Sequence, residues 1–265
     1  MKNPVDFPSD DILVVEVADG TAWMRFNRPD QLNCFTPELY GTIKDAVRVA
    51  EHNDDVDTIV FTGTGRSFAT GGDLKEVLAR ITDTNPLPWF EFVDACPFDA
   101  IRDCKKLVIS AVNGLCYAAG LLITLMSDIS IGAESATFAF PETRVGFAES
   151  FSVACLAGRV SWSKAKYMLY TGLPVAAQEA ERIGLITEVV PDDQLFSRVD
   201  EVIKELRDSS FEAQMLFKEY INRLTPPLEW PDLFRGLSTS DAVAFLEKFK
   251  ARGEGKENQA EREAS

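Results

Sequence analysis

The stretch NGLCYAAGLLITLMSDISIGAE, residues 113–134, is the segment on which the fold prediction depends. It opens on an Asn-Gly turn, passes through two alanines and a glycine at residues 118–120, and continues as an uncharged apolar run up to Met126. Such a run is typical of a helix that is buried on every side. Small residues at its start allow a ligand to approach backbone N–H groups that have no partner within the helix. We therefore expect a binding site at this junction.

Strands and helices are predicted to alternate on both sides of this segment. Residues 12–17 and 21–26 are short β-type runs joined by Ala-Asp-Gly, which indicates a hairpin. Thr36 and Pro37 are typical of a helix N-cap and a first helical residue, and the helix is expected to end near Glu51. Further strands are predicted at residues 58–62, 106–114, 128–134 and 136–142. This order favours an α/β fold with a largely parallel sheet.

Helices are predicted to dominate the rest of the chain. A helix is expected to begin at Asp73 or Leu74, and residues 82–98 are interpreted as a loop and short helix, with another helix after Pro97. Later helices are predicted at residues 163–170, 176–183, 192–208, 211–224 and 230–249, with one strand at 186–190. The predicted division is a core of residues 1–200 and a helical region of residues 201–265 that ends in a frayed, charged tail.

Composition and charge limit the class of partner. The 265 residues carry a formal net charge of −15, which argues against nucleic acid and against anionic membranes as partners, because both need a basic surface. The five cysteines are odd in number and lack CxxC spacing, which favours free thiols in a reducing compartment. No signal peptide and no apolar run of the ~18–20 residues that span a membrane are recognised. We expect a cytoplasmic protein.

Two loops of similar design are the strongest candidates for chemistry. SFATGGDLK (residues 67–75) and GLCYAAGLL (residues 114–122) each follow a buried strand and lead into a helix through small residues. If the fold brings them together, two backbone N–H groups point at one oxygen and form an oxyanion hole. The alternative is that both are ordinary strand-to-helix turns in which glycine and alanine permit tight packing.

Four motifs in order resemble the crotonase family, the enoyl-CoA hydratases and isomerases. They are FNRPDQLNCF, FTGTGRSFATGGDLKE, AVNGLCYAAGLLITLMSDISIGAESATFAFPETRVG and AFLEKFKARG, and with their spacing they cover roughly residues 12–250. The resemblance implies a crotonase-like spiral of ββα turns, with a C-terminal helical region that helps to cover the site. It also implies trimers or dimers of trimers, and an acyl-coenzyme A thioester whose carbonyl lies in the oxyanion hole.

The resemblance assigns the backbone donors to Gly72 and Ala119. The family usually has glycine at the second position, so the alanine methyl narrows the approach. Family hydratases pair two glutamates; the first position here is Leu122, which cannot transfer a proton, and the second is Glu142. A single glutamate suits moving one proton between two carbons. The sequence therefore favours an isomerase over a hydratase.

A second acid–base group is considered at Glu149. Some family members carry a catalytic aspartate one position later, where this chain has Ser150. The alternative is that Glu149 is a surface or capping charge and that Ser150 caps the following helix. For Glu142 the alternative is an exposed loop carboxylate.

Substrate contacts are expected from charged, backbone and aromatic groups. The coenzyme A contacts implied by the resemblance are Arg28, Ala69, Asp73, Leu74 and Lys75. Aromatic and apolar residues that could line the acyl pocket are Trp89, Phe90, Phe92, Phe98, Tyr117 and Leu122. A pocket of this kind would prefer a bulky or cyclic acyl group. Alternatively, the cations are solvated and the aromatic rings only pack the core.

Other chemistries are excluded by what the sequence lacks. His52, the only histidine, lies in a polar helix end and is predicted at the surface, which argues against a catalytic triad. No ligand-spaced cluster predicts a metal, no separate cofactor is expected, and GTGRSFATGG lacks the end of a nucleotide-binding loop. The predicted function is enoyl-CoA double-bond isomerisation, with hydration or carbon–carbon bond chemistry as alternatives. An acyl-CoA carrier without catalysis is the alternative from another class.

Overall fold

The computed structural model describes residues 7–251, apart from 9, 77–91, 227, 229–234 and 236–238. Trp89 and Phe90, two of the residues predicted for the acyl pocket, lie outside the described residues. Most of the loop and short helix predicted at 82–98, and the first part of the helix predicted at 230–249, also lie outside them.

The larger of two sheets has six strands in the order β1-β2-β3-β5-β7-β10. Their bounds are β1 Leu13–Ala18, β2 Thr21–Phe26, β3 Thr58–Gly63, β5 Leu107–Val112, β7 Ile129–Ala133 and β10 Glu188–Val190. The predicted hairpin β1–β2 is antiparallel, and the other neighbouring pairs are parallel. β3 and β5 are buried along their whole length, as expected for inner strands of a parallel sheet.

The smaller sheet has four short strands in the order β4-β6-β8-β9. Their bounds are β4 Ser67–Ala69, β6 Leu115–Tyr117, β8 Thr137–Ala139 and β9 Val175–Ala176. The chain moves from β3 to β4, from β5 to β6 and from β7 to β8, so each turn adds one strand to each sheet before a helical segment follows. This is the predicted α/β spiral of ββα turns.

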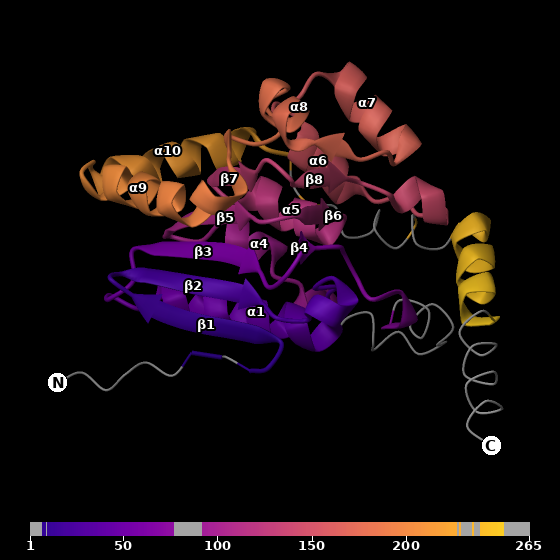
Figure 1. The fold of residues 1–265 in the computed structure, drawn as a ribbon, viewed down its shortest axis with the longest axis horizontal. Coiled ribbons are helices and arrows are strands. Elements are labelled where there is room, and N and C mark those ends of the chain that lie inside the picture. Colours follow the sequence, from indigo (N-terminus) through magenta and orange to yellow (C-terminus); the bar gives the residue numbers. More distant parts are fainter. Residues whose placement is uncertain are drawn as a thin grey trace.

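Helices cover the sheets and fill the second half of the chain (Figure 1). Their bounds are α1 Pro37–Glu51, α4 Phe98–Arg102, α5 Ala119–Met126, α6 Ser150–Leu156, α7 Trp162–Thr171, α8 Ala177–Arg182, α9 Leu195–Arg207 and α10 Phe211–Leu224. Short 3-10 turns lie at η1 Pro29–Gln31, η2 Glu142–Val145 and η3 Asp192–Gln194. Residues 74–76 and 240–251 are also helical. No helix within the described part of the chain has the length and hydropathy needed to cross a membrane.

The start of α1 follows the predicted capping chemistry. The Thr36 hydroxyl accepts a hydrogen bond from the Leu39 N–H at 3.2 Å, with Pro37 as the first residue of α1. The predicted domain edge after residue 200 falls inside α9, which is one continuous helix. A boundary there would cut the helix, and the division of the chain into a core and a helical region stays a prediction.

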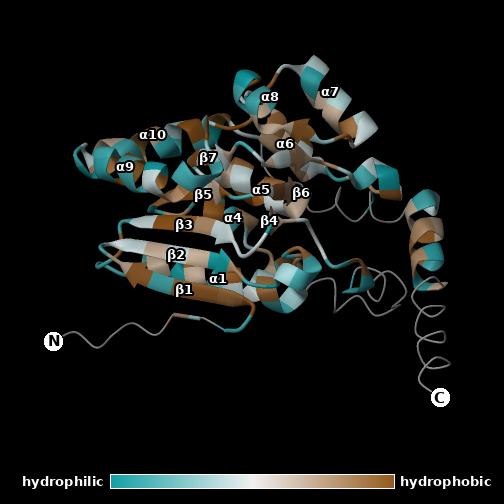
Figure 2. Cartoon of the chain, viewed as in Figure 1, coloured by the Kyte–Doolittle hydropathy of each residue, from teal (hydrophilic) through white to brown (hydrophobic). Residues whose placement is uncertain are grey.

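Strand alternation divides the core between the two faces of the larger sheet. Val60, Ile109 and Ile131 face the amphipathic helix α9, whose teal and brown bands are visible in Figure 2. Their neighbours Ile59 and Phe61 face the other side, where α1 and α5 pack. Side chains of successive strand residues point to opposite faces. Both faces of the sheet are therefore covered, and the loops that follow the strands are held by packed elements.

The C-terminal segment packs against the loop that follows η2. Ala242 and Leu246 pack against Phe147, which follows η2. The Thr239 hydroxyl donates to the Gly146 carbonyl at 2.5 Å. The end of the described chain therefore rests on the loop that carries Glu142.

Candidate active site

The two strand-to-helix loops meet in the structure. A Cβ atom built on Gly71 would lie 2.6 Å from the Ala118 Cβ, closer than real side chains approach. The Phe35 N–H donates to Gly71 O at 2.7 Å and the Asp73 N–H donates to Phe35 O at 2.9 Å. Neither of these two hydrogen bonds uses the N–H of Gly72, which lies between the two loop residues.

Helix α5 presents the second backbone donor. Ala119 is its first residue, and a first-turn N–H has no carbonyl partner inside its own helix. The preceding Ala118 has φ of +52°, in the half of conformational space that favours glycine. Its N–H donates to Ala139 O at 2.9 Å, and its carbonyl accepts from Leu122 N–H at 3.0 Å. These two bonds anchor the turn from which α5 starts.

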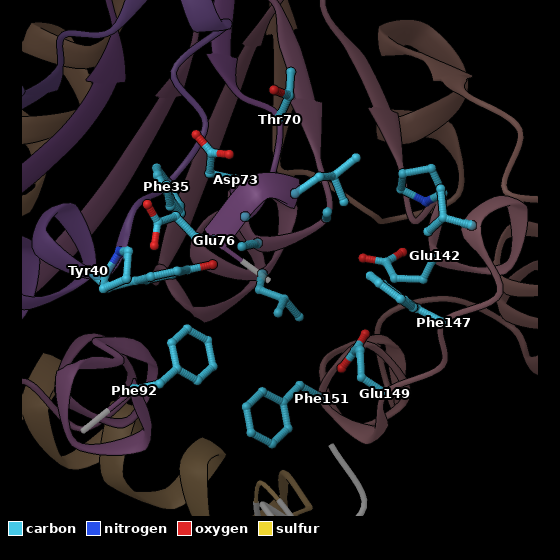
Figure 3. Close-up of a pocket in the computed structure, with 18 of the residues that line it drawn as sticks. Phe35, Tyr40, Thr70, Asp73, Glu76, Phe92, Glu142, Phe147, Glu149 and Phe151 are labelled. Carbon is cyan, nitrogen blue, oxygen red and sulfur yellow. The ribbon is translucent and has the colours of Figure 1, made fainter. Parts of the chain in front are cut away.

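A cavity of about 240 Å³ opens beside these two amides. Its wall includes Gly72 and Ala119, Leu122, and the two carboxylates of Glu142 and Glu149. Figure 3 shows both carboxylates on one side, with aromatic rings across and below. The cavity is also lined by Asp73, Leu74, Phe92 and Phe98, so the structure brings together nine of the residues that the sequence analysis selected.

Glu142 lies at the start of η2, immediately after Pro141. Its Oε2 atom is buried and has no hydrogen-bond partner among the described residues. Burial raises the pKa of the Glu142 carboxyl to about 8, and the neighbouring Glu149 carboxylate contributes to the rise. Glu142 is therefore a carboxyl with one free oxygen in the cavity, not an exposed loop carboxylate, and its pKa is suited to proton transfer near neutral pH.

Glu149 is more strongly held. Its carboxylate accepts from the Ser152 N–H at 2.9 and 3.1 Å, which makes Glu149 itself the N-cap of α6. The expectation that Ser150 is the N-cap is wrong, because Ser150 is already the first helical residue. Burial raises the pKa of Glu149 above its ordinary value, although hydrogen bonds from Ser152 and Phe151 partly oppose the rise. Glu149 is thus both a capping residue and a part of the cavity wall.

A second cavity, of about 590 Å³, adjoins the first. The two share Thr70, Gly72, Asp73 and Leu74, and the second is also lined by Arg28 and Lys75. The Arg28 guanidinium donates to Cys34 O at 2.6 Å and lies 3.7 Å from Asp73 Oδ2. Four of the five residues predicted to contact coenzyme A therefore lie around one cavity.

Two predicted contacts do not reach either cavity. Ala69 is fully buried in β4, and its carbonyl packs so closely to Gly120 that a Cβ there would lie 2.4 Å away. Tyr117 is in β6, where its hydroxyl lies 2.9 Å from Thr137 Oγ1 and not in the acyl cavity. Both placements correct the prediction, because the residues on these strands are taken up by sheet pairing.

Several cavity residues were not selected from the sequence. Tyr40, Phe35, Phe147 and Phe151 all contribute to the wall. They are spread over separate elements, and nothing in their local sequence distinguishes them from core residues. His52 is exposed at the C-cap of α1, as predicted.

Comparison with known proteins assigns the class. Residues 16–234 match the family model described as enoyl-CoA hydratase/isomerase. A probable mitochondrial enoyl-CoA hydratase of Dictyostelium discoideum is 31% identical over 203 residues, covering 74% of this chain and 70% of the relative. A 1,2-epoxyphenylacetyl-CoA isomerase of Escherichia coli K12 is 28% identical, covering 80% and 82%.

Solved structures agree with this assignment. An enoyl-CoA hydratase of Mycobacterium avium subsp. paratuberculosis K-10 aligns with a TM-score of 0.76 and 28% identity, covering 92% of this chain and 97% of the other. The fold and the cavity define an enzyme of the crotonase superfamily. The chain belongs to the enoyl-CoA hydratase/isomerase family.

Proposed function

We propose that this enzyme moves the double bond of an enoyl-CoA from position 3 to position 2. The observation that carries the proposal is the carboxyl of Glu142 beside the two loop amides, whose Oε2 atom is buried and has no hydrogen-bond partner among the described residues, with Leu122 at the place of a second glutamate. A single proton-transferring group is sufficient for isomerisation, since the proton removed from one carbon is returned to another.

The proposed reaction conserves atoms and electrons. Glu142 takes the proton from C2, and the electron pair of that bond moves toward the thioester oxygen to form a dienolate. The N–H groups of Gly72 and Ala119 would stabilise the developing charge on that oxygen. Glu142 then returns the proton to C4, which leaves the double bond between C2 and C3.

In this proposal coenzyme A is the part of the substrate by which the enzyme binds it, and it is not a separate cofactor. Arg28 and Lys75 lie around the second cavity and offer positive charge near the path of the coenzyme A phosphates. Cytoplasmic location and assembly into trimers or dimers of trimers are parts of the same proposal. Metals and further cofactors play no part in it.

Hydration of a 2-enoyl-CoA is the second candidate. Glu149 supports it, because its carboxylate lines the same cavity as Glu142 and could help to hold a water. The relatives named above as hydratases support it as well. Against it stands the capping bond from the Ser152 N–H, which occupies the Glu149 carboxylate. Carbon–carbon bond chemistry and binding without catalysis remain alternatives.

Incubation with paired substrates tests the proposal. The purified protein is given a 3-enoyl-CoA and, separately, a 2-enoyl-CoA, and mass and conjugated-thioester absorbance are followed. We expect conjugation of the 3-enoyl substrate without a gain in mass, and loss of that activity in Glu142→Gln. A gain of one water by the 2-enoyl substrate as the dominant reaction would assign a hydratase. Binding without either change in the wild type would assign a carrier.

A further inference from the structure

Aromatic rings make up much of the wall of the cavity that holds Glu142. Six aromatic residues contribute to its wall: Phe35, Tyr40, Phe92, Phe98, Phe147 and Phe151. Figure 3 shows the rings of Phe92 and Phe151 below the carboxylates, away from Thr70 and Asp73. These rings come from separate elements along the chain, so the fold itself gathers them around one space.

Ring-to-ring contacts hold these side chains in fixed orientations. Tyr40 is in edge-to-face contact with Phe92 at 5.5 Å and with Phe98 at 5.9 Å between centroids. Phe98 is in the same kind of contact with Phe151 at 5.9 Å. Such pairs are preferred arrangements of aromatic rings. The wall is therefore preorganised, and a ligand does not have to order it.

The direction of the substrate follows from the two adjoining cavities. Arg28 and Lys75 line only the second cavity, which shares Thr70, Gly72 and Asp73 with the first. A ligand whose phosphates lie near the cations must therefore enter past these shared residues. Its acyl group then extends toward the aromatic rings.

The size of the aromatic cavity suits a ring. Its volume is about 240 Å³, and an apolar cavity of about 150 Å³ in another protein binds benzene. The remaining volume leaves room for a short linker to the thioester. An unfilled apolar space loses packing contacts on its lining, and a ring that fits it restores them.

The charge of the wall restricts the ligand further. Glu142, Glu149, Asp73 and Glu76 all contribute to the cavity, and none of the described residues that line it is a cation. A carboxylate on the acyl group would lie in a poorly solvated space near the Glu149 carboxylate, with no cation among the described lining residues to pair with it. The cavity therefore selects against anionic acyl groups.

We propose that the acyl group is a neutral aromatic or alicyclic ring joined to the thioester by a short linker. The proposal rests on the proposed function for the position of the thioester. A ring has fewer torsions to immobilise than a straight chain with the same number of carbons, so it loses less entropy on binding. In the isomerisation, (cyclohex-1-enyl)acetyl-CoA would give cyclohexylideneacetyl-CoA. The proton would leave C2 and return to C4, counted from the thioester carbonyl, which is a carbon of the ring.

Calorimetry with saturated acyl-CoAs tests the substrate class without requiring turnover. We expect cyclohexylacetyl-CoA to bind about tenfold more tightly than octanoyl-CoA, which has the same number of acyl carbons. We also expect adipoyl-CoA to bind at least about tenfold more weakly than hexanoyl-CoA, because of its terminal carboxylate. Equal binding of the ring and the chain, or of the adipoyl and hexanoyl thioesters, would overturn the proposal.

A variant and its control locate the preference. Phe92→Leu should reduce the ring preference to about threefold or less, because the edge-to-face wall is lost. The matched control is Phe196→Leu on α9, whose ring is half-exposed and pairs edge-to-face with Trp23 at 6.0 Å. It should retain the full preference, and an equal loss in both variants would contradict the assignment to this cavity.

Turnover separates this inference from the proposed function. Preferred binding of cyclohexylacetyl-CoA, without conversion of either (cyclohex-1-enyl)acetyl-CoA or 3-octenoyl-CoA, would support the substrate class and reject the isomerase. Conversion of 3-octenoyl-CoA with no preference for a ring in binding would support the isomerase and reject the substrate class.

Discussion

At the residue scale, the glutamates Glu142 and Glu149 differ in the hydrogen bonds that their carboxyl groups make. Glu149 accepts the Ser152 N–H and caps a helix, whereas Oε2 of Glu142 has no partner among the described residues. Hydrogen bonds to a carboxylate favour its charged form, and burial opposes it. Glu142 is therefore the group whose proton is held at neutral pH, and Glu149 acts on it through charge.

This difference predicts a pH dependence of activity. Glu142 must be ionised to remove a proton, and its pKa is raised to about 8, so kcat/KM should rise with pH toward a plateau above that value. Glu149→Gln removes the neighbouring charge while the amide oxygen can still accept the capping bond. It should shift the rise to lower pH with little change in the plateau. A large loss of activity at all pH values would instead make Glu149 a direct proton carrier.

The same raised pKa predicts a stability effect with a definite sign. Between the ordinary glutamate pKa of 4.5 and about 8, the folded protein binds more protons than the unfolded chain does. The free energy of unfolding therefore contains a contribution that is present at low pH and is lost as pH rises through this window. Glu142→Gln lacks that loss. The melting temperature of Glu142→Gln minus that of the wild type should therefore increase from about pH 5 to about pH 8. A difference that does not change with pH would contradict the raised pKa.

The sequence could supply some of these residues and not others. The family resemblance of the FPETRVG motif and the loop motifs pointed to Glu142, Gly72, Ala119 and the replacement at Leu122, and all four line one cavity. The capping role of Glu149 depends on where α6 begins, within one residue, and sequence patterns do not fix that boundary. Phe147 and Phe151 enter the cavity only through the packing of separate elements.

At the scale of elements, the site depends on close contact between β4 and α5. Gly120 approaches Ala69 O so closely that any side chain at residue 120 would collide with the backbone. This contact sets the position of the first turn of α5, and with it the Ala119 N–H. The small residues at 118–120 therefore serve close packing and access to the amide together.

Substitution of a glycine tests this dependence. Gly120→Ala would place a Cβ 2.4 Å from Ala69 O and push α5 from β4. We expect kcat to fall about 100-fold or more, because a displaced oxyanion donor costs about 10²–10³ in rate. Gly41→Ala is the control, since Gly41 lies in α1 with no atom near its Cβ position. Its activity should be unchanged, and unchanged activity in Gly120→Ala would contradict the role of this contact.

Element prediction succeeded where local signals were strong. The buried strands β3, β5 and β7, the capped helix α1 and the hairpin β1–β2 all lie close to their expected bounds. β4, β6 and β9 are three residues long or shorter, and they form a separate sheet through contacts between distant segments. That pairing is a tertiary effect, and the spiral could be expected only from the resemblance to a known family.

At the scale of the whole molecule, α10 carries an apolar surface. Phe217, Ile221 and Leu224 are 66%, 61% and 85% exposed, and all three line a groove beside buried Lys218. Exposed apolar patches on a protein often mark contacts with another chain. This surface supports the proposed assembly into trimers or dimers of trimers.

The assembly can be measured directly. Light scattering of the purified protein should give three or six times the chain mass of 29.4 kDa. Leu224→Lys should lower the mass toward that of one chain, because a charge cannot be buried in an apolar contact at low cost. Val17→Lys, at an exposed valine of β1, is the control and should leave the mass unchanged. A wild type with the mass of one chain would reject the assembly.

The central claim is that Glu142 carries one proton between two carbons of the same substrate. It is tested most directly by a single-turnover reaction of a 3-enoyl-CoA deuterated at C2, with mass spectrometry and NMR locating the label in the product. The account predicts that part of the deuterium appears at C4, and that Glu142→Gln abolishes the reaction while Glu149→Gln transfers label as the wild type does. A product that contains only solvent hydrogen at C4, together with inactivity of Glu149→Gln, would contradict it.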